Sequence, residues 1–168
     1  MNRWLTVMTL AASMAMAGCS VATPGEAASS AASSSPTTAA ESPLLTVHKS
    51  PTCGCCALWV DHVKASGFRA EIQLADDIEP VKRRVGVPAG YGSCHTAEVE
   101  GYFIEGHVPA SDIQRLLKER PDALGLTVPG MPMGSPGMEV PPGEVRPYTV
   151  FLVHKDGTVS PFSEHGPR

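Results

Sequence analysis

The segment Thr52-Cys53-Gly54-Cys55-Cys56 lies between two patterns that together predict the start of an α/β fold. Before it, the apolar run Leu44–His48 is typical of a short strand. After it, apolar residues recur at the i, i+3, i+4 and i+7 spacing of one helix face: Cys56, Trp59, Val60 and Val63. Gly67 is expected to end this helix. The sequence therefore predicts a strand, a cysteine-bearing turn and a helix in succession.

The chain from residue 68 to residue 162 predicts a sheet with helices packed on it. The expected elements are a strand at Phe68–Leu74, a helix capped by Asp77 and closed by Gly86, a hairpin of Ala97–Val99 with Tyr102–Ile104, a helix opened by Ser111 or Asp112 and ended by Pro121, and late strands at Tyr148–His154 and Thr158–Phe162. Strands that alternate with helices indicate a sheet flanked by helices. The predicted fold class is α/β, with a Met-rich loop and a β-hairpin as a C-terminal extension.

The N-terminal region predicts export from the cytoplasm. Met1–Ala17 joins a positive Arg3 to an apolar run that is too short to span a bilayer as a mature helix, as in a secretion signal. Met16-Ala17-Gly18-Cys19 resembles a lipoprotein cleavage motif, which would make Cys19 a lipidated first residue; an ordinary cleaved signal is the alternative. We expect a signal peptide at 1–18, a flexible Ala/Ser/Pro tether at 19–43 and a folded domain at 44–168. The predicted compartment is the periplasm, where disulfides are permitted, with the membrane reached only through the lipid anchor.

The net charge of the chain argues against nucleic acid as a binding partner. The chain has 168 residues, with 13 Lys and Arg against 17 Asp and Glu, for a net charge of −4. A mildly acidic chain lacks the basic face that phosphate backbones require, so nucleic acid is not expected as a partner. The length fits one domain, or one domain with a tail.

Four cysteines beyond the N-terminal region are expected to meet in one pocket. Cys53 and Cys56 form a C-x-x-C pair at a helix start, where free N–H groups and the helix dipole favour thiolate. This arrangement resembles a thioredoxin-like fold, in which a loop before the third strand packs against the pair. By topology that loop is Ser93-Cys94-His95-Thr96, which lacks the proline usual there. Cys53, Cys55, Cys56 and Cys94 should therefore lie together, beside an imidazole.

Clustered thiols serve several kinds of protein. Structural disulfides are one alternative in an exported domain, although the adjacent Cys55 and Cys56 fit two separate bridges poorly. A thiol–disulfide oxidoreductase needs only Cys53 as nucleophile and Cys56 as resolving thiol. Four-ligand zinc sites normally use two separated pairs rather than three cysteines within four residues.

A methionine cluster favours copper(I) among the metals. Met131, Met133 and Met138 lie in a Pro/Gly-rich segment with no helix or strand period to bury them. Thioether sulfur binds soft Cu(I) well and zinc poorly, whereas the alternative role is to fill gaps under a loop. Because about two to four soft ligands satisfy one Cu(I), the surplus of sulfur suggests bridging thiolates that hold more than one copper.

Taken together, these motifs resemble the CopG-type family of copper-resistance proteins. The resemblance runs in order from the cysteine motif and Trp59 through the stretches 93–97, 101–102, 105–109, 129–132 and 134–139. It implies a periplasmic thioredoxin-like domain that binds copper ions for copper tolerance, with copper redox chemistry as a further implication. Carried over by position, it implies a metal set of Cys53, Cys55, Cys56, Cys94, Met131, Met133 and Met138. Other periplasmic copper-handling proteins would be its partners.

The histidines leave alternatives open. His95 is either a ligand or a hydrogen-bonding replacement for the missing proline, and His107 is either a structural residue or a ligand. His62 is expected to be solvated and His165 to lie in a frayed tail. The run Lys82-Arg83-Arg84 is expected to be a solvated helix face. Two questions stay open: whether the protein turns over copper as an oxidoreductase or only holds it, and whether it is instead a disulfide-stapled module that binds a partner.

Overall fold

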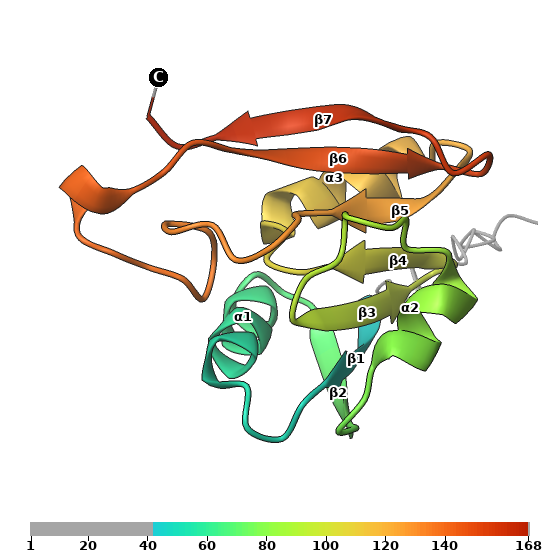
Figure 1. The fold of residues 1–168 in the computed structure, drawn as a ribbon, viewed down its shortest axis with the longest axis horizontal. Coiled ribbons are helices and arrows are strands. Elements are labelled where there is room, and N and C mark those ends of the chain that lie inside the picture. Colours follow the sequence, from blue (N-terminus) through green and yellow to red (C-terminus); the bar gives the residue numbers. More distant parts are fainter. Residues whose placement is uncertain (1–41, 168) are drawn as a thin grey trace, which may run out of the picture. The chain divides into compact units, whose positions relative to one another are not determined.

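The computed structural model describes residues 42–167, and within them one mixed sheet carries three α-helices (Figure 1). The sheet order is β2-β1-β3-β4-β5-β6-β7. The elements in chain order are β1 (Leu44–Lys49), α1 (Gly54–Ala65), β2 (Arg69–Leu74), α2 (Glu79–Val85), β3 (His95–Val99), β4 (Tyr102–Glu105), α3 (Ala110–Glu119), β5 (Ala123–Thr127), the 3-10 turn η1 (Pro142–Glu144), β6 (Tyr148–His154) and β7 (Val159–His165).

The strand pairings place the start of α1 beside the start of β3. β1 pairs parallel with β2 through the α1 crossover, and antiparallel with β3, where Lys49 lies opposite His95. The end of β1 and the start of β3 therefore meet at one edge of the sheet. The segment that follows β1 and the segment that precedes β3 are brought together there.

The core lies between α1, α3 and one face of the sheet. The predicted apolar face of α1 is confirmed, because Cys56, Trp59, Val60 and Val63 are its buried residues. They pack with Ile113 and Leu116 of α3 and with alternate strand residues such as Leu45 and Val47. α2 contributes a different residue to the interior, since Lys82 is its buried side chain. The expectation that the run at 82–84 is wholly solvated is therefore wrong at Lys82.

The predicted element order is confirmed through α3, with shifted ends. α2 begins at Glu79, whose N–H donates to Asp77 Oδ1 (2.9 Å), and α3 begins at Ala110 rather than at Ser111 or Asp112. β5 was not predicted, because its sequence Ala-Leu-Gly-Leu-Thr lacks a β-branched run. Gly125 belongs in that strand for a steric reason: a Cβ there would lie 2.0 Å from the Phe103 carbonyl oxygen.

Of the two late strands, β6 has the predicted bounds and β7 extends further than expected. β7 continues to His165, whose Nε2 lies 2.6 Å from Asp112 Oδ2 and whose ring stacks on Tyr148, so the predicted frayed tail is wrong at this residue. The predicted signal peptide, Cys19 and the tether as far as residue 41 lie outside the described residues. Among residues 42–167, no helix is long and apolar enough to cross a bilayer.

Candidate metal centre

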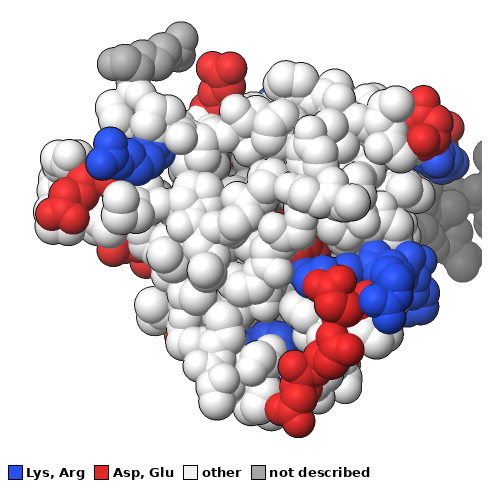
Figure 2. Space-filling model, in the orientation of Figure 1, with Lys and Arg blue, Asp and Glu red and all other residues white. Residues whose placement is uncertain are grey.

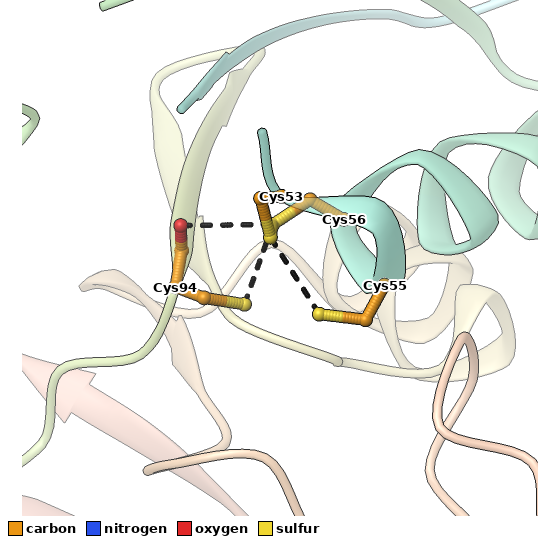
Figure 3. A group of neighbouring side chains, drawn as sticks. All are labelled: Cys53, Cys55, Cys56 and Cys94. Atoms are coloured by element: carbon orange, nitrogen blue, oxygen red, sulfur yellow. Dashed lines mark hydrogen bonds between the residues drawn. A yellow bond between two sulfur atoms is a disulfide. The ribbon is translucent and has the colours of Figure 1, made fainter. Parts of the chain in front are cut away.

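Three of the cysteines lie where β1 turns into α1. Cys53 is the N-cap of the helix, with extended backbone (φ −77°, ψ 99°), and its N–H donates to the Ser50 carbonyl (3.2 Å). Cys53 and Cys56 are joined by a disulfide, whereas Cys55 is a half-buried free thiol (Figure 3). The helix start therefore carries a disulfide-forming pair and one extra thiol, at the positive end of the helix dipole.

Cys94 meets these cysteines from the loop before β3, as Figure 3 shows. Its Sγ lies 3.4 Å from Cys56 Sγ, and Cys53 Sγ lies 3.5 Å from Cys55 Sγ. All four sulfur atoms lie within 4.8 Å of one another. The predicted convergence of the four cysteines is confirmed, while their role as metal ligands stays a prediction.

The environment of Cys94 favours its protonated form in the absence of a metal. Burial, followed by the charge of the neighbouring Cys55, raises the pKa of the Cys94 thiol to about 11. A cation bound at the cluster would therefore have to displace a proton from this sulfur.

His107 presents a lone pair to Cys94. Its Nδ1 lies 2.8 Å from the Pro136 carbonyl oxygen, which can only accept, so Nδ1 carries the proton and donates. Its Nε2 then faces Cys94 Sγ at 3.1 Å without a proton. Burial lowers the pKa of His107, which keeps the ring neutral. A neutral imidazole whose second nitrogen is fixed by a carbonyl is the usual form of a metal-binding histidine.

His95 lies deeper, between Trp59 and His107. Its ring centroid is 4.4 Å from that of Trp59 and 5.1 Å from that of His107, and its Nδ1 is 3.4 Å from Cys94 Sγ. Nε2 is buried without a hydrogen-bond partner. Burial first, then the nearby His107 and Lys82, lower the pKa of His95 well below its ordinary value. Cys94, His95 and His107 thus form a second group of candidate ligand atoms within 4.8 Å of one another, which shares Cys94 with the first.

The three methionines differ in their relation to the cysteines. Met131 Sδ lies 3.9 Å from Cys55 Sγ, and the Met131 side chain is 51% exposed. The Met133 side chain is 37% exposed, and the backbone carbonyl of Met138 accepts from Gly134 N–H. The structure therefore brings Met131 to the cluster on its solvent side, and it gives no contact of this kind for the sulfurs of Met133 and Met138 within residues 42–167.

The Met loop, residues 129–139, packs directly on the first turns of α1. Gly137 has a φ of +83°, and a Cβ there would lie 2.7 Å from the Cys55 carbonyl oxygen and 2.8 Å from Trp59 N. Only glycine permits this approach. The same loop supplies the Pro136 carbonyl that orients His107. The loop is thus part of the cluster wall.

Several residues shape the site through contacts that the sequence did not reveal. The indole N–H of Trp59 donates to the Val108 carbonyl (2.9 Å), which fixes the ring beside His95. His62 is half-buried rather than solvated, because its Nε2 accepts from Ala110 N–H (3.1 Å). Lys82 and Glu105 form a buried ion pair behind the Cys94 loop. Backbone partners such as the Val108 carbonyl leave no signal in a residue pattern.

The donor set is soft and rich in sulfur. Two free thiols, a thioether and two neutral imidazoles lie at one edge of the sheet, and reduction of the Cys53–Cys56 disulfide would add two more thiols. Figure 2 shows that uncharged residues make up most of the face drawn there, with many of the charged side chains gathered toward its lower right. Thiolate, thioether and imidazole suit copper(I), whereas calcium and magnesium need oxygen ligands that these donors do not provide.

Comparisons with known proteins agree with this chemistry. A family model described as "Protein of unknown function, DUF411" matches residues 91–138. A solved structure titled "Copper resistance protein copG- Form 2" is 44% identical, with a TM-score of 0.71, over 74% of this chain and 99% of that one. A second, titled "Copper resistance protein copG- Form 1", is 43% identical, with a TM-score of 0.71, over 76% of this chain and 100% of that one. None of the curated protein sequences matches the chain.

Proposed function

The chain belongs to the CopG family of copper resistance proteins, and from this we propose that it binds Cu(I) through its clustered sulfurs and so contributes to copper tolerance. The observation that carries the proposal is the approach of four cysteine Sγ atoms to within 4.8 Å of one another. Three come from the start of α1 and the fourth from the loop before β3, so a single ion can be held by segments far apart in the chain once the Cys53–Cys56 disulfide is reduced.

The number of donors supports binding of more than one copper. The four cysteines exceed the need of one Cu(I), and Cys94 belongs to both candidate ligand groups. A thiolate shared between two ions would use the sulfur surplus. We therefore propose a thiolate-bridged cluster in which Cys94 is a bridging ligand, with His107 and Met131 as candidates at its edges.

Titration with Cu(I) tests this proposal. The protein is fully reduced and kept anaerobic, Cu(I) is added in competition with a chelator of known affinity, and the copper per chain is counted by native mass spectrometry. We expect more than one Cu(I) per chain, and we expect the Cys94→Ser variant to lose both affinity and stoichiometry. Saturation at one ion would remove the cluster, and the absence of tight binding would remove the function.

The disulfide makes a redox role chemically available. Two thiols at Cys53 and Cys56 can reduce two Cu(II) to two Cu(I), forming the disulfide and releasing two protons. Anaerobic addition of Cu(II) to the reduced protein should then remove two free thiols for every two Cu(I) formed. Peptide mass spectrometry of the product should find the new disulfide between Cys53 and Cys56, and a Cys53→Ser variant, which cannot form this bond, should produce Cu(I) more slowly.

A thiol–disulfide oxidoreductase is the second candidate function, and the Cys53–Cys56 disulfide at a helix N-terminus is the observation that favours it. The triple variant with Leu at positions 131, 133 and 138 separates the two functions. It should weaken Cu(I) binding and leave dithiol exchange with a model disulfide intact. A disulfide-stapled binding module is a third candidate, for which a free-thiol count on anaerobically prepared protein would find Cys53 and Cys56 still joined as a disulfide.

We further propose that the protein lies in the periplasm and is lipidated at Cys19. In that compartment it would exchange copper with other copper-handling proteins. The β2-β1-β3-β4 part of the sheet, with α1 as the parallel crossover, supports a thioredoxin-like relationship. Cell fractionation of the parent and of a Cys19→Ala variant tests the anchor, because only the parent should stay with the membrane.

A further inference from the structure

A fully buried carboxylate lies directly behind the Cys94 loop. Glu105, the last residue of β4, has a relative exposure of 0%. It accepts from three segments: from Lys82 Nζ of α2, from the Thr96 hydroxyl of β3 (2.6 Å), and from Ser93 N–H in the loop (2.5 Å). Two of these donors, Ser93 and Thr96, stand on either side of Cys94 and His95 in the chain. Glu105 therefore holds the backbone N–H of Ser93 on one side of those two residues and the side chain of Thr96 on the other.

The neighbouring glycine gives independent support for this contact. Gly106 has a φ of +72°, and a Cβ there would lie 2.5 Å from Ser93 Cβ and 2.6 Å from the Val128 carbonyl oxygen. A side chain at this position would push Ser93 away from the end of β4. The chain thus admits Ser93 to within hydrogen-bond distance of Glu105 only because the next residue has no side chain.

Ser93 also joins the Cys94 loop to the Met loop. Its hydroxyl donates to the Gly130 carbonyl, and Gly130 N–H donates to the Gly92 carbonyl (3.1 Å). Gly130 immediately precedes Met131, whose sulfur lies 3.9 Å from Cys55 Sγ. The contact between Glu105 and Ser93 N–H therefore helps to position both the Cys94 loop and the Met loop.

The stability of the fold alone does not explain why Lys82 and Glu105 form a buried ion pair. Lys82 is 6% exposed and Glu105 is 0% exposed, so both charges lose most of their hydration, and buried ion pairs are often replaceable by apolar residues without loss of stability. The directional bonds to Ser93 N–H and to the Thr96 hydroxyl, by contrast, hold the two residues that flank Cys94 and His95.

From these contacts we infer that Glu105 is a positioning residue for the copper ligands: its carboxylate holds the Cys94 loop, and through Ser93 the start of the Met loop, against the start of α1. The inference rests on the proposed Cu(I) site. It adds to that site a residue that touches no sulfur and that sets its geometry.

Two double variants separate positioning from stability. K82M/E105Q and K82M/E105L both remove the buried ion pair. Gln keeps an oxygen for Ser93 N–H and can donate its amide to Thr96 Oγ1, whereas Leu leaves Ser93 N–H without an acceptor. The first readout is copper-free: the alkylation rate of Cys94 in the reduced protein, followed by peptide mass spectrometry. We expect it to rise at least fivefold in K82M/E105L and to stay near the parent rate in K82M/E105Q.

The second readout is Cu(I) affinity by chelator competition, for which we expect at least a tenfold loss in K82M/E105L and less than a threefold loss in K82M/E105Q. Equal alkylation rates and equal affinities in the two variants would overturn the inference. If K82M/E105L does not fold, K82M/E105M takes its place. Hydrogen exchange in the parent protein is an independent test of the contact: Ser93 N–H must exchange slowly, and fast exchange overturns the inference. A parent that binds no Cu(I) refutes the proposed function, while the alkylation and exchange results still report whether Glu105 holds the loop.

Discussion

Replacement of Gly137 by alanine should detach the Met loop from α1. Gly137 has a φ of +83°, where an L-residue is strained by about 1–2 kcal/mol. In addition, the new Cβ would lie 2.7 Å from the Cys55 carbonyl oxygen, whereas ordinary contact begins at 3.4 Å. The loop must therefore withdraw by about 0.7 Å, because the helix backbone on the other side cannot yield. The contact between the Pro136 carbonyl and His107 would weaken with it.

Gly143 provides the matched control in the segment that follows. A Cβ at Gly143 meets nothing within 4 Å. Gly143→Ala should therefore leave the thermal stability and the Cu(I) affinity of the protein unchanged. Thermal unfolding of the reduced, metal-free protein should show a loss of about 2 kcal/mol for Gly137→Ala, equivalent to several degrees in Tm. Chelator competition should show weaker Cu(I) binding by the same variant. If Gly137→Ala melts and binds copper as Gly143→Ala does, the loop is not part of the cluster wall.

Substitutions at Met131, His62 and Lys82 have effects on Cu(I) affinity or stability that follow from the structure. Met131→Leu should weaken Cu(I) binding about tenfold, and Met133→Leu less than twofold, since within residues 42–167 the Met131 sulfur contacts a cysteine and the Met133 sulfur does not; equal effects in chelator competition would contradict this assignment. His62 accepts the first N–H of α3, and burial lowers its pKa below the ordinary 6.5, so the unfolded chain binds the proton more readily and stability should fall as the pH drops below about 6.5. In urea titrations at pH 7 and pH 5, that fall should be smaller for His62→Gln, and an equal fall would show that the cap does not contribute. Lys82→Met alone should lower the free energy of unfolding by about 3–5 kcal/mol, because it leaves Glu105 as an unpaired buried charge. K82M/E105Q should recover most of this loss in urea titrations. A single variant as stable as the double variant would show that the pair is not buried in solution.

Those parts of the fold that depend on residue periodicity could be predicted from the sequence. The buried face of α1 follows from the spacing of Cys56, Trp59, Val60 and Val63, and the β3–β4 hairpin follows from two short apolar runs around a turn. β5 could not be predicted in this way, because Gly125 is required by the approach of the Phe103 backbone rather than by any pattern of its own.

The candidate site could be predicted only in part. The meeting of Cys94 with the first three cysteines follows from aligning the chain to a known topology. The buried state of Lys82 has no local signal, because a run of three basic residues is ordinarily solvated and its partner Glu105 is 23 residues away. The selection of Met131 from the three methionines depends on how the Met loop packs, which a Pro/Gly-rich sequence does not specify.

X-ray absorption at the copper edge, on the reduced protein loaded anaerobically with Cu(I), tests the sulfur cluster most directly. The account predicts a first shell dominated by sulfur, a copper–copper scattering contribution from bridging thiolates, and the loss of that contribution in Cys94→Ser. A first shell of nitrogen or oxygen, or a Cys94→Ser spectrum identical to that of the parent, would contradict it.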